Sequence, residues 1–233
     1  MPAEIPHHLE RAFRFGVPFD GNGFAFELFS FALPDLALPS GRLVACDPIV
    51  VPDMMPFTVT LPAGRAHCQL SIARLESGDE RVAFAWLGGD ASRVARWELA
   101  LRGDQDPKRL QPDGYFGYPV DSGTGGYMDA ETSAILATLG KQDDKWWDRL
   151  IAALEITQRN TWAWASFLPT DNAANVLAFS SGFGDGVYPA YIGIDSGGRV
   201  CGFLTDFLVA DPPLAAPKDE PRPPRPWWKS WKR

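Results

Sequence analysis

Two glycine-rich segments carry the residues of this chain whose types and spacing could do chemistry. They cover residues 118–129 and 180–191, and glycine allows a backbone to approach a ligand closely. Together with one aspartate on a later apolar segment, their side chains form a candidate ligand-binding set: Asp121, Thr124, Asp129, Asp185, Tyr188 and Asp206. These carboxylates and hydroxyls suit a divalent cation or a hydroxyl-rich ligand better than a nucleotide, because carboxylates repel phosphate.

The sequence leaves the cofactor unknown, and a divalent cation is compatible with these carboxylates, since hard cations prefer oxygen ligands. The candidate metal ligands are Asp121, Asp185 and Asp206. Asp129 and Asp195 could complete such a site, which would support metal-assisted hydrolysis with Tyr188 orienting the substrate. The spacing of these residues does not force them together, so a second interpretation stays open, in which the glycines supply positive φ angles for tight turns.

Signatures of other catalytic sites are missing from the sequence. The first segment has neither the G-x-G-x-x-G spacing nor a Walker lysine, and the second matches neither an EF-hand loop nor a nucleophile elbow. A Ser-His-Asp or Cys-His site would need a histidine, but His7 and His8 lie at a terminus that we expect to be mobile, and His67 begins a strand. The three cysteines form no C-x-x-C pair, so the sequence supports neither a zinc site nor a disulfide framework.

Asp206 stands out because it lies in an apolar run, residues 202–209. In a strand of period two it shares a face with Leu204 and Leu208. A carboxylate in such surroundings must be ion-paired, hydrogen-bonded or protonated. We expect a structural ion pair, with Arg42 or Arg74 as the partner.

The elements that must position these residues are mainly strands. Alternation of apolar and polar residues, bounded by turn residues, indicates strands over residues 24–33, 42–51, 57–61, 66–75, 81–87, 96–101, 162–168, 176–180, 187–194 and 199–209. The 21 prolines also favour short strands joined by turns over a helix bundle.

Two helices are expected in the middle of the chain. Asp129 caps the first, which Gly140 ends, and the second runs from residue 143 or 144 to 157 with an apolar stripe of Trp146, Leu150 and Leu154. The fold class is therefore α+β, mainly antiparallel β, as a sandwich or a strongly twisted sheet. We expect one domain over residues 1–211 and a mobile, extended proline-rich tail over residues 212–233.

Charge restricts the partners. The 233 residues hold 22 bases and 29 acids, a formal net charge of −7. Residues 217–233 hold six bases and two acids, so residues 1–216 carry −11. An acidic body disfavours nucleic acid and favours a basic protein partner, and the tail, with three tryptophans among basic residues, is a second candidate contact. No signal peptide or transmembrane segment is visible, so we expect a cytoplasmic protein.

Several separated motifs, in the same order, resemble those of a bacterial domain-of-unknown-function family, number 4241. They are residues 38–48, 118–125, 128–129, 181–189 and 205–207. The resemblance covers about residues 25–209 and leaves out the first 20 residues and the tail. It implies a bacterial protein and brings no established activity.

The sequence thus predicts a non-enzymatic protein- or ligand-binding module, of the immunity or accessory type, whose acidic body meets a basic partner. The alternative is a metal-dependent hydrolase that uses the carboxylates of the two glycine-rich segments.

Overall fold

The computed structural model describes residues 7–21, 24–50, 52–111, 114–143 and 145–210. The predicted tail lies outside the described residues. Strands dominate the structure and pair antiparallel, so the expected α+β class with mainly antiparallel sheet is confirmed. No helix in the described part of the chain has the length and apolar character needed to cross a membrane.

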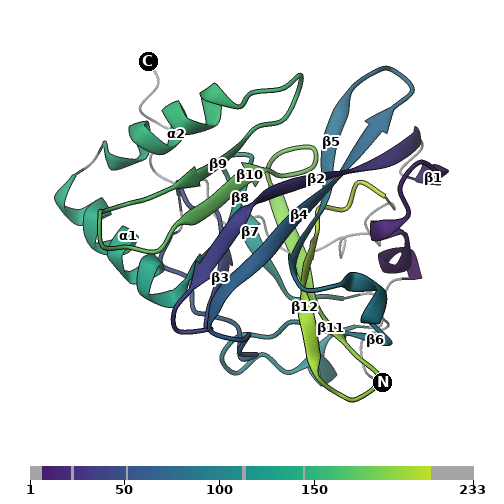
Figure 1. The fold of residues 1–233 in the computed structure, drawn as a ribbon, viewed down its shortest axis with the longest axis horizontal. Coiled ribbons are helices and arrows are strands. Elements are labelled where there is room, and N and C mark those ends of the chain that lie inside the picture. The colour runs from purple at the N-terminus through teal and green to yellow at the C-terminus, as the bar shows by residue number, and fades with distance from the viewer. Residues whose placement is uncertain (1–6, 22–23, 51, 112–113, 144, 211–233) are drawn as a thin grey trace.

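One antiparallel sheet has eight strands (Figure 1). In spatial order these are β1 (Pro18–Gly21), β2 (Phe24–Leu38), β4 (Gly64–Leu75), β5 (Glu80–Gly88), β12 (Val200–Asp206), β11 (Gly186–Ile194) and β6 (Arg96–Leu99), with β7 (Gly117–Val120) also pairing β11. β6 and β7 pair two successive stretches of the same edge of β11, because β6 opposes residues 191–194 and β7 opposes residues 186–189.

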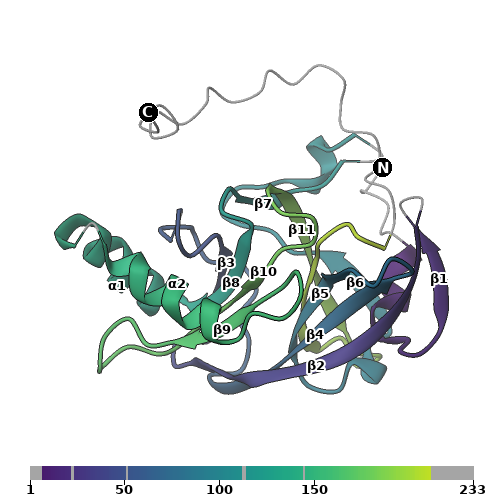
Figure 2. The ribbon, with the colours of Figure 1, turned by 90° about the horizontal axis from the view of Figure 1, so that it is seen from above.

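A second sheet of four strands packs against the first, and two helices cover its other face (Figure 2). Its strands are, in order, β3 (Leu43–Cys46), β8 (Thr124–Asp129), β10 (Val176–Ser180) and β9 (Trp164–Phe167). The helices are α1 (Ala130–Gln142) and α2 (Trp146–Ile156). The molecule therefore has three layers, and the four-stranded sheet is the middle one.

Successive residues of a strand in the middle sheet point to opposite faces, so this sheet contributes to two hydrophobic cores. On β3, Leu43 and Ala45 belong to the core between the sheets, whereas Val44 and Cys46 belong to the core under the helices. All four residues are fully buried. A strand that is apolar on both faces, as β3 is, suits only a layer that is covered on both sides.

The helices follow the sequence prediction except at one end. Asp129 caps α1 as expected, since its Oδ1 accepts the Glu131 N–H at 3.0 Å. Gly140 does not end α1, which continues to Gln142. Gly140 keeps an ordinary helical backbone, without the positive φ of a helix-ending glycine, and lies beside Trp146, the buried residue that begins α2. A glycine inside a helix costs only about 1 kcal/mol relative to alanine, so it does not by itself end α1.

The N-terminal histidine segment is ordered, so the expectation of a mobile terminus is wrong for residues 7–13. These residues form a 3-10 helix, η1 (His7–Phe13), against the outer face of the eight-stranded sheet. Leu9 and Ala12 are fully buried, and Phe13 packs edge-on against Trp86 with ring centroids 5.4 Å apart. Burial of these apolar side chains offsets the entropy of ordering a short terminal segment.

Two further strand predictions were wrong. Residues 57–61 form only isolated bridges, and flanking prolines such as Pro56 and Pro62 remove backbone donors there. Conversely, β7 and β8 lie where the sequence predicted only a glycine-rich loop. Glycine and proline are rare in strands, so local propensity argues against these two elements, and their pairing with β10 and β11 overrides it.

Tyrosine hydroxyls form hydrogen bonds in the core between the sheets. Thr205 Oγ1 lies 3.2 Å from the hydroxyl of Tyr118 and 2.8 Å from that of Tyr127. Burial raises the pKa of Tyr188 to about 12, and it also raises the pKa values of Tyr118, Tyr127 and Tyr191. The fold thus favours the neutral phenol at all four positions.

We predict that these tyrosines make the protein unfold at alkaline pH. Their pKa is higher in the folded than in the unfolded chain, so their contribution to stability is complete below the ordinary value of 10.0 and is lost as the pH rises from 10.0 to about 12 and beyond. Ultraviolet absorbance of tyrosinate, followed with circular dichroism, should show the four buried phenols ionising together with loss of structure. Independent ionisation near pH 10.0 in a folded protein would contradict this.

Candidate functional site

The two glycine-rich segments form one structure, a two-stranded ribbon that bends from one sheet into the other. β7 pairs β11 in the large sheet, and β8 pairs β10 in the middle sheet. The chain passes from β7 to β8 through residues 121–123 and from β10 to β11 through residues 181–185. The structure therefore brings together the segments whose proximity the sequence left open. We call this bend, residues 121–123 and 181–185, the corner.

Glycines make the corner possible. Gly123, Gly182 and Gly184 have φ angles of +69°, +44° and +117°, which side chains rarely adopt. A Cβ on Gly182 would lie only 2.7 Å from the carbonyl oxygen of Phe207. The second interpretation of the sequence, in which glycine serves tight turns, describes these three positions. Strands that change sheets commonly need such a bend.

A buried carboxylate that the sequence analysis did not single out holds the corner in place. Asp47 is fully buried, and its Oδ2 accepts the N–H groups of Asp121 at 2.9 Å and Ser122 at 2.7 Å. Its Oδ1 accepts the N–H groups of Ile49 and Val50. The usable sequence signal was an aspartate directly after a strand and before a proline, a typical position for an Asx turn.

Hydrogen bonds also hold the second turn of the corner, residues 181–185. The carbonyl oxygen of Gly184 accepts hydrogen bonds from the hydroxyls of Ser181 at 2.9 Å and Tyr188 at 2.6 Å. The Ser181 N–H donates to the carbonyl of Gly123 at 3.0 Å and thus joins the two turns. Tyr188 is 5% exposed, and the hydroxyl of this candidate residue stabilises the turn through its hydrogen bond to Gly184.

Asp129 and Thr124 lie on β8, away from the tip of the corner. Asp129 is fully buried and accepts the N–H and hydroxyl of Ser40, at 3.0 Å and 2.8 Å, besides capping α1. Thr124 is buried and pairs with Ser180 across the ribbon. The carboxylate of Asp129 thus ties the segment before β3 to the start of α1 and is already occupied by donors.

Asp121 and Asp185 are the candidate residues whose carboxylates have neither a hydrogen-bond donor nor an ion-pair partner among the described residues. The last pair of the β7–β11 register is Val120 with Gly186, so the next residues along the ribbon are Asp121 and Asp185. Within the described part of the chain, neither carboxylate accepts a hydrogen bond or forms an ion pair. Asp185 is exposed and Asp121 is half-buried, and the exposed side chains of Phe183 and Val187 flank Asp185 along the chain.

The partner of Asp206 is His8, and the expectation of Arg42 or Arg74 was wrong. Oδ2 of the fully buried Asp206 lies 2.6 Å from Nε2 of His8, and its Oδ1 accepts the Leu208 N–H at 2.8 Å. Asp206 faces outward from the large sheet, and η1 covers that face. Arg74 instead pairs with Glu80 at 3.0 Å.

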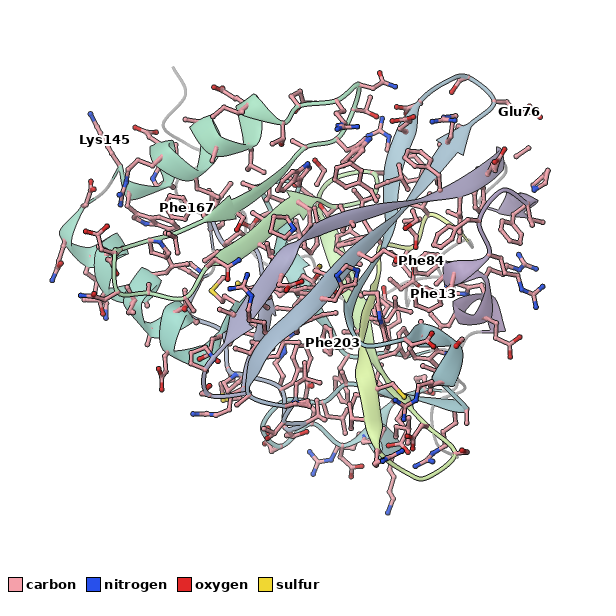
Figure 3. All side chains as sticks on the ribbon, in the orientation of Figure 1. Phe13, Glu76, Phe84, Lys145, Phe167 and Phe203 are labelled. Carbon is pink, nitrogen blue, oxygen red and sulfur yellow. The ribbon has the colours of Figure 1, made fainter. Side chains whose placement is uncertain are left out.

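An aromatic contact accompanies the pair of His8 and Asp206. The rings of His8 and Phe84 lie 6.1 Å apart between centroids, and Figure 3 labels Phe84 of β5 and Phe13 of η1. The His8–Asp206 pair therefore fastens the first described helix to the last strand. This link joins positions 198 residues apart, which no local sequence pattern reveals.

Asp195 stabilises the hairpin between β11 and β12. Its Oδ1 accepts the N–H groups of Gly197 and Arg199 at 2.9 Å, and its Oδ2 accepts guanidinium N–H groups of Arg93 and Arg199 at 3.1 Å. The backbone hydrogen bond from Arg199 is the main cause that lowers the pKa of Asp195 below its usual range. Two arginines thus take the place that a cation would need.

The candidate metal ligands do not gather at one point. Asp121 and Asp185 lie at the corner, whereas Asp206 faces η1 on the outer side of the sheet. Over the ranges that the structure describes, no group of three or more His, Cys, Asp or Glu side chains is arranged to hold a metal ion. The carboxylates therefore divide into those that fasten the fold and the pair at the corner.

Comparison with known proteins gives one match. A family model described as "Protein of unknown function (DUF4241)" matches residues 36–205, which include both halves of the corner and leave out η1 and β1. No curated protein and no solved structure matches the chain.

Replacement of Gly182 by alanine should destabilise the protein by about 3 kcal/mol, since it adds a left-handed backbone penalty and a clash with Phe207. Gly78 is a matched control, because its φ is +84° and no atom lies within 4 Å of the position that an alanine Cβ would take there. Gly78→Ala should cost only about 1 kcal/mol. Urea unfolding measures both, and equal losses would show that contact with Phe207 is unimportant.

Replacement of His8 by alanine should lower the free energy of unfolding by about 3 kcal/mol, because Asp206 would stay buried without its partner. In a double-mutant cycle with Asp206→Ala, the two losses should fail to add by at least about 1 kcal/mol. Glu10→Ala, an exposed change on the same helix, should stay within about 0.5 kcal/mol of the unchanged protein. A similarly small effect of His8→Ala would mean that the pair does not stabilise the fold.

Proposed function

The chain belongs to the DUF4241 family, a family of unknown function, and we propose that it is a non-enzymatic protein-binding module that holds a basic partner at the corner. The observation that carries this proposal is the position of Asp121 and Asp185. The ribbon sets them at adjacent positions, and both carboxylates are uncommitted among the described residues. Lysine or arginine side chains of a partner would supply the missing donors.

Exposed apolar side chains beside these carboxylates support a protein partner. Phe183, in the same turn as Asp185, is 47% exposed, and Val187, at the start of β11, is 51% exposed. Protein interfaces commonly combine apolar anchors with a polar rim. The guanidinium of Arg81 lies 5.4 Å from the ring centroid of Phe183, so this ring already receives one cation from its own chain.

Rigidity of the corner favours recognition. Asp47 fixes the turn at Asp121 from below, and the carbonyl of Gly184 fixes the turn before Asp185. A surface that is held in its binding geometry loses little conformational entropy on association. The corner thus presents charge and apolar area at low entropic cost.

The acidic body would guide the partner. Residues 1–216 carry a net charge of −11, which attracts a basic protein at long range and accelerates encounter at low ionic strength. The tail with its tryptophans stays a second candidate contact, outside the described residues. We further propose an immunity or accessory role in a bacterial cytoplasm, which three cysteines without disulfide partners support.

The alternative function, a metal-dependent hydrolase, receives less support from the geometry. Donors of the protein already occupy Asp129 and Asp195, and His8 occupies Asp206. Of the carboxylates predicted to hold a cation, Asp121 and Asp185 are those left to do so.

Affinity capture from an extract of the source organism tests the binding role. Two variants should each weaken binding of a basic partner by about tenfold or more, because each loses contacts at the corner. They are the double variant Asp121→Asn/Asp185→Asn and the single variant Phe183→Ala. Higher salt should also weaken binding of the partner to the unchanged protein. The thermal midpoint of the Asp variant should stay unchanged, since these carboxylates accept no hydrogen bond in the described structure.

Glu76→Gln/Asp171→Asn is the matched control, with the same change of charge at exposed positions away from the corner. It should capture the partner as the unchanged protein does. If the corner variants and the control capture equally, or if no partner is recovered, the corner is not a binding surface.

A further inference from the structure

A cavity lies at the end of the large sheet where β11 turns into β12 (Figure 1). Its volume is about 320 Å³, which is in the range of small-ligand sites. The residues that line it include Asp90, Arg93, Asp195, Arg199 and Cys201. Four of these side chains carry a charge at neutral pH, so the cavity suits a polar ligand.

Two arginines meet at one buried carboxylate in the wall of this cavity. Nη2 of Arg93 and Nε of Arg199 each lie 3.1 Å from Oδ2 of Asp195. Asp195 is 5% exposed, and its Oδ1 accepts the N–H groups of Gly197 and Arg199. Because both guanidiniums contact the same oxygen atom of a residue that lines the cavity, their charged ends lie together at its wall.

Both guanidiniums keep N–H groups for a ligand. A guanidinium has about five N–H donors, and Arg199 uses its Nε–H on Asp195, so its two Nη nitrogens donate to no acceptor among the described residues. The side chains of Arg93 and Arg199 are 56% and 75% exposed, so the remaining donors reach solvent. Each oxygen of Asp195 already accepts two hydrogen bonds. Two positive charges therefore share one saturated carboxylate, which favours a further anion beside them.

The backbone that carries Arg93 is fixed before any ligand arrives. Arg93 is the last residue of a short 3-10 helix, η2 (Ala91–Arg93). Just before η2, the Gly89 N–H donates to the carbonyl oxygen of Cys201 at 3.1 Å, and the carbonyl of Gly89 accepts the indole N–H of Trp86 at 2.9 Å. These bonds hold the segment against β12, so binding at this wall loses little conformational entropy.

Asp90 adds a second requirement for the ligand. Its exposed carboxylate lines the same cavity and accepts the Ser92 N–H at 2.9 Å, which caps η2. It forms no ion pair with any residue in the described ranges. A ligand that carries an ammonium or hydroxyl group would supply a donor to this carboxylate, whereas a ligand with negative groups alone would be repelled by it.

The thiol of Cys201 can report whether the cavity is occupied. Cys201 is half-buried, and its Sγ lies 3.9 Å from the carbonyl oxygen of Arg199. Burial raises the pKa of this thiol above its ordinary value, and the charges of the two arginines and two aspartates act on it as well. The other cysteines, Cys46 and Cys68, are fully buried. A reagent that alkylates the folded protein should therefore react at Cys201.

We propose that Arg93 and Arg199 bind the oxyanion group, carboxylate or phosphate, of a small polar ligand whose ammonium or hydroxyl group donates to Asp90. The two Nη nitrogens of Arg199 form a planar fork that matches two oxygens of either group. This site is separate from the corner and goes beyond the binding role assigned there. Asp185 directly precedes β11 and Asp195 directly follows it, and the nine residues of this strand span about 30 Å.

Alkylation of Cys201 in the folded protein by iodoacetamide, an uncharged reagent, tests the proposal, with mass spectrometry to identify the modified cysteine. Ethyl phosphate and propionate supply the two anionic groups. At about 50 mM, an anion with a dissociation constant of about 5 mM should slow the reaction about tenfold relative to sodium chloride of equal ionic strength, because only the empty cavity reacts. The stronger of the two distinguishes a phosphate from a carboxylate ligand. If neither anion slows alkylation, the proposal is wrong.

The contribution of Asp90 is tested with matched ligands. Phosphoethanolamine and β-alanine are ethyl phosphate and propionate with an added ammonium group. Each should protect Cys201 better than its matched anion, and the variant Asp90→Asn should remove this advantage, since the ammonium would lose its ionised acceptor. Equal protection by both members of each pair would contradict the role of Asp90.

Two variants, Arg93→Met and Arg199→Met, separate binding from structure. Each should lose most of the protection, measured as the ratio of alkylation rates without and with the anion, so that a changed reactivity of the thiol cancels. Exposed ion pairs contribute little to stability, so the thermal midpoint should stay within about 4 °C of the unchanged protein. Arg199→Lys keeps the charge but loses the fork, so its protection should be intermediate. Full protection in both methionine variants, or a larger fall of the midpoint, would make these arginines structural residues.

Two control variants complete the test. Arg74→Met removes an arginine that is 57% exposed and pairs with Glu80 at 3.0 Å, away from the cavity, and it should keep full protection. Asp121→Asn/Asp185→Asn should also keep it, even if this variant loses a protein partner, so failure at one site is distinguishable from failure at the other. Loss of protection in Arg74→Met would reveal general charge screening and would overturn the proposal.

Discussion

The bent ribbon at the corner is the constraint on which the rest of the molecule depends. The same two stretches of chain pair as β7 with β11 in one sheet and as β8 with β10 in the other. Because the ribbon is continuous, the two sheets must face each other at the distance and angle that the bend allows. The core between the sheets, the position of the helices on the far side and the exposure of Asp185 all follow from this bend.

Buried carboxylates stabilise this arrangement by accepting backbone and side-chain donors. Asp47 holds the corner, Asp129 holds the start of α1, Asp195 holds a hairpin, and Asp206 holds the N-terminal helix. A buried carboxylate without donors would be strongly unfavourable, so each of these side chains specifies which segments meet. The buried aspartates of this protein thus serve mainly to hold segments of the chain together.

Three charged side chains fall outside this pattern. Asp121 and Asp185 stand at the corner with uncommitted carboxylates, and Arg102 is buried with uncommitted donors in the described structure. Proteins tolerate such local conflicts where a ligand or partner resolves them.

Local pattern was enough to determine the fold class, most strands, both helices and the capping role of Asp129. These features depend on residues close in sequence, such as the alternation in β3 and β4 or the stripe of Trp146 and Leu150. Tertiary structure alone decided that the two glycine-rich segments form one corner, that His8 reaches Asp206, and that Arg102 pairs with no acid among the described residues. Each of these rests on contacts between distant segments, whose energies depend on which surfaces the whole fold buries, and a single sequence does not display that choice.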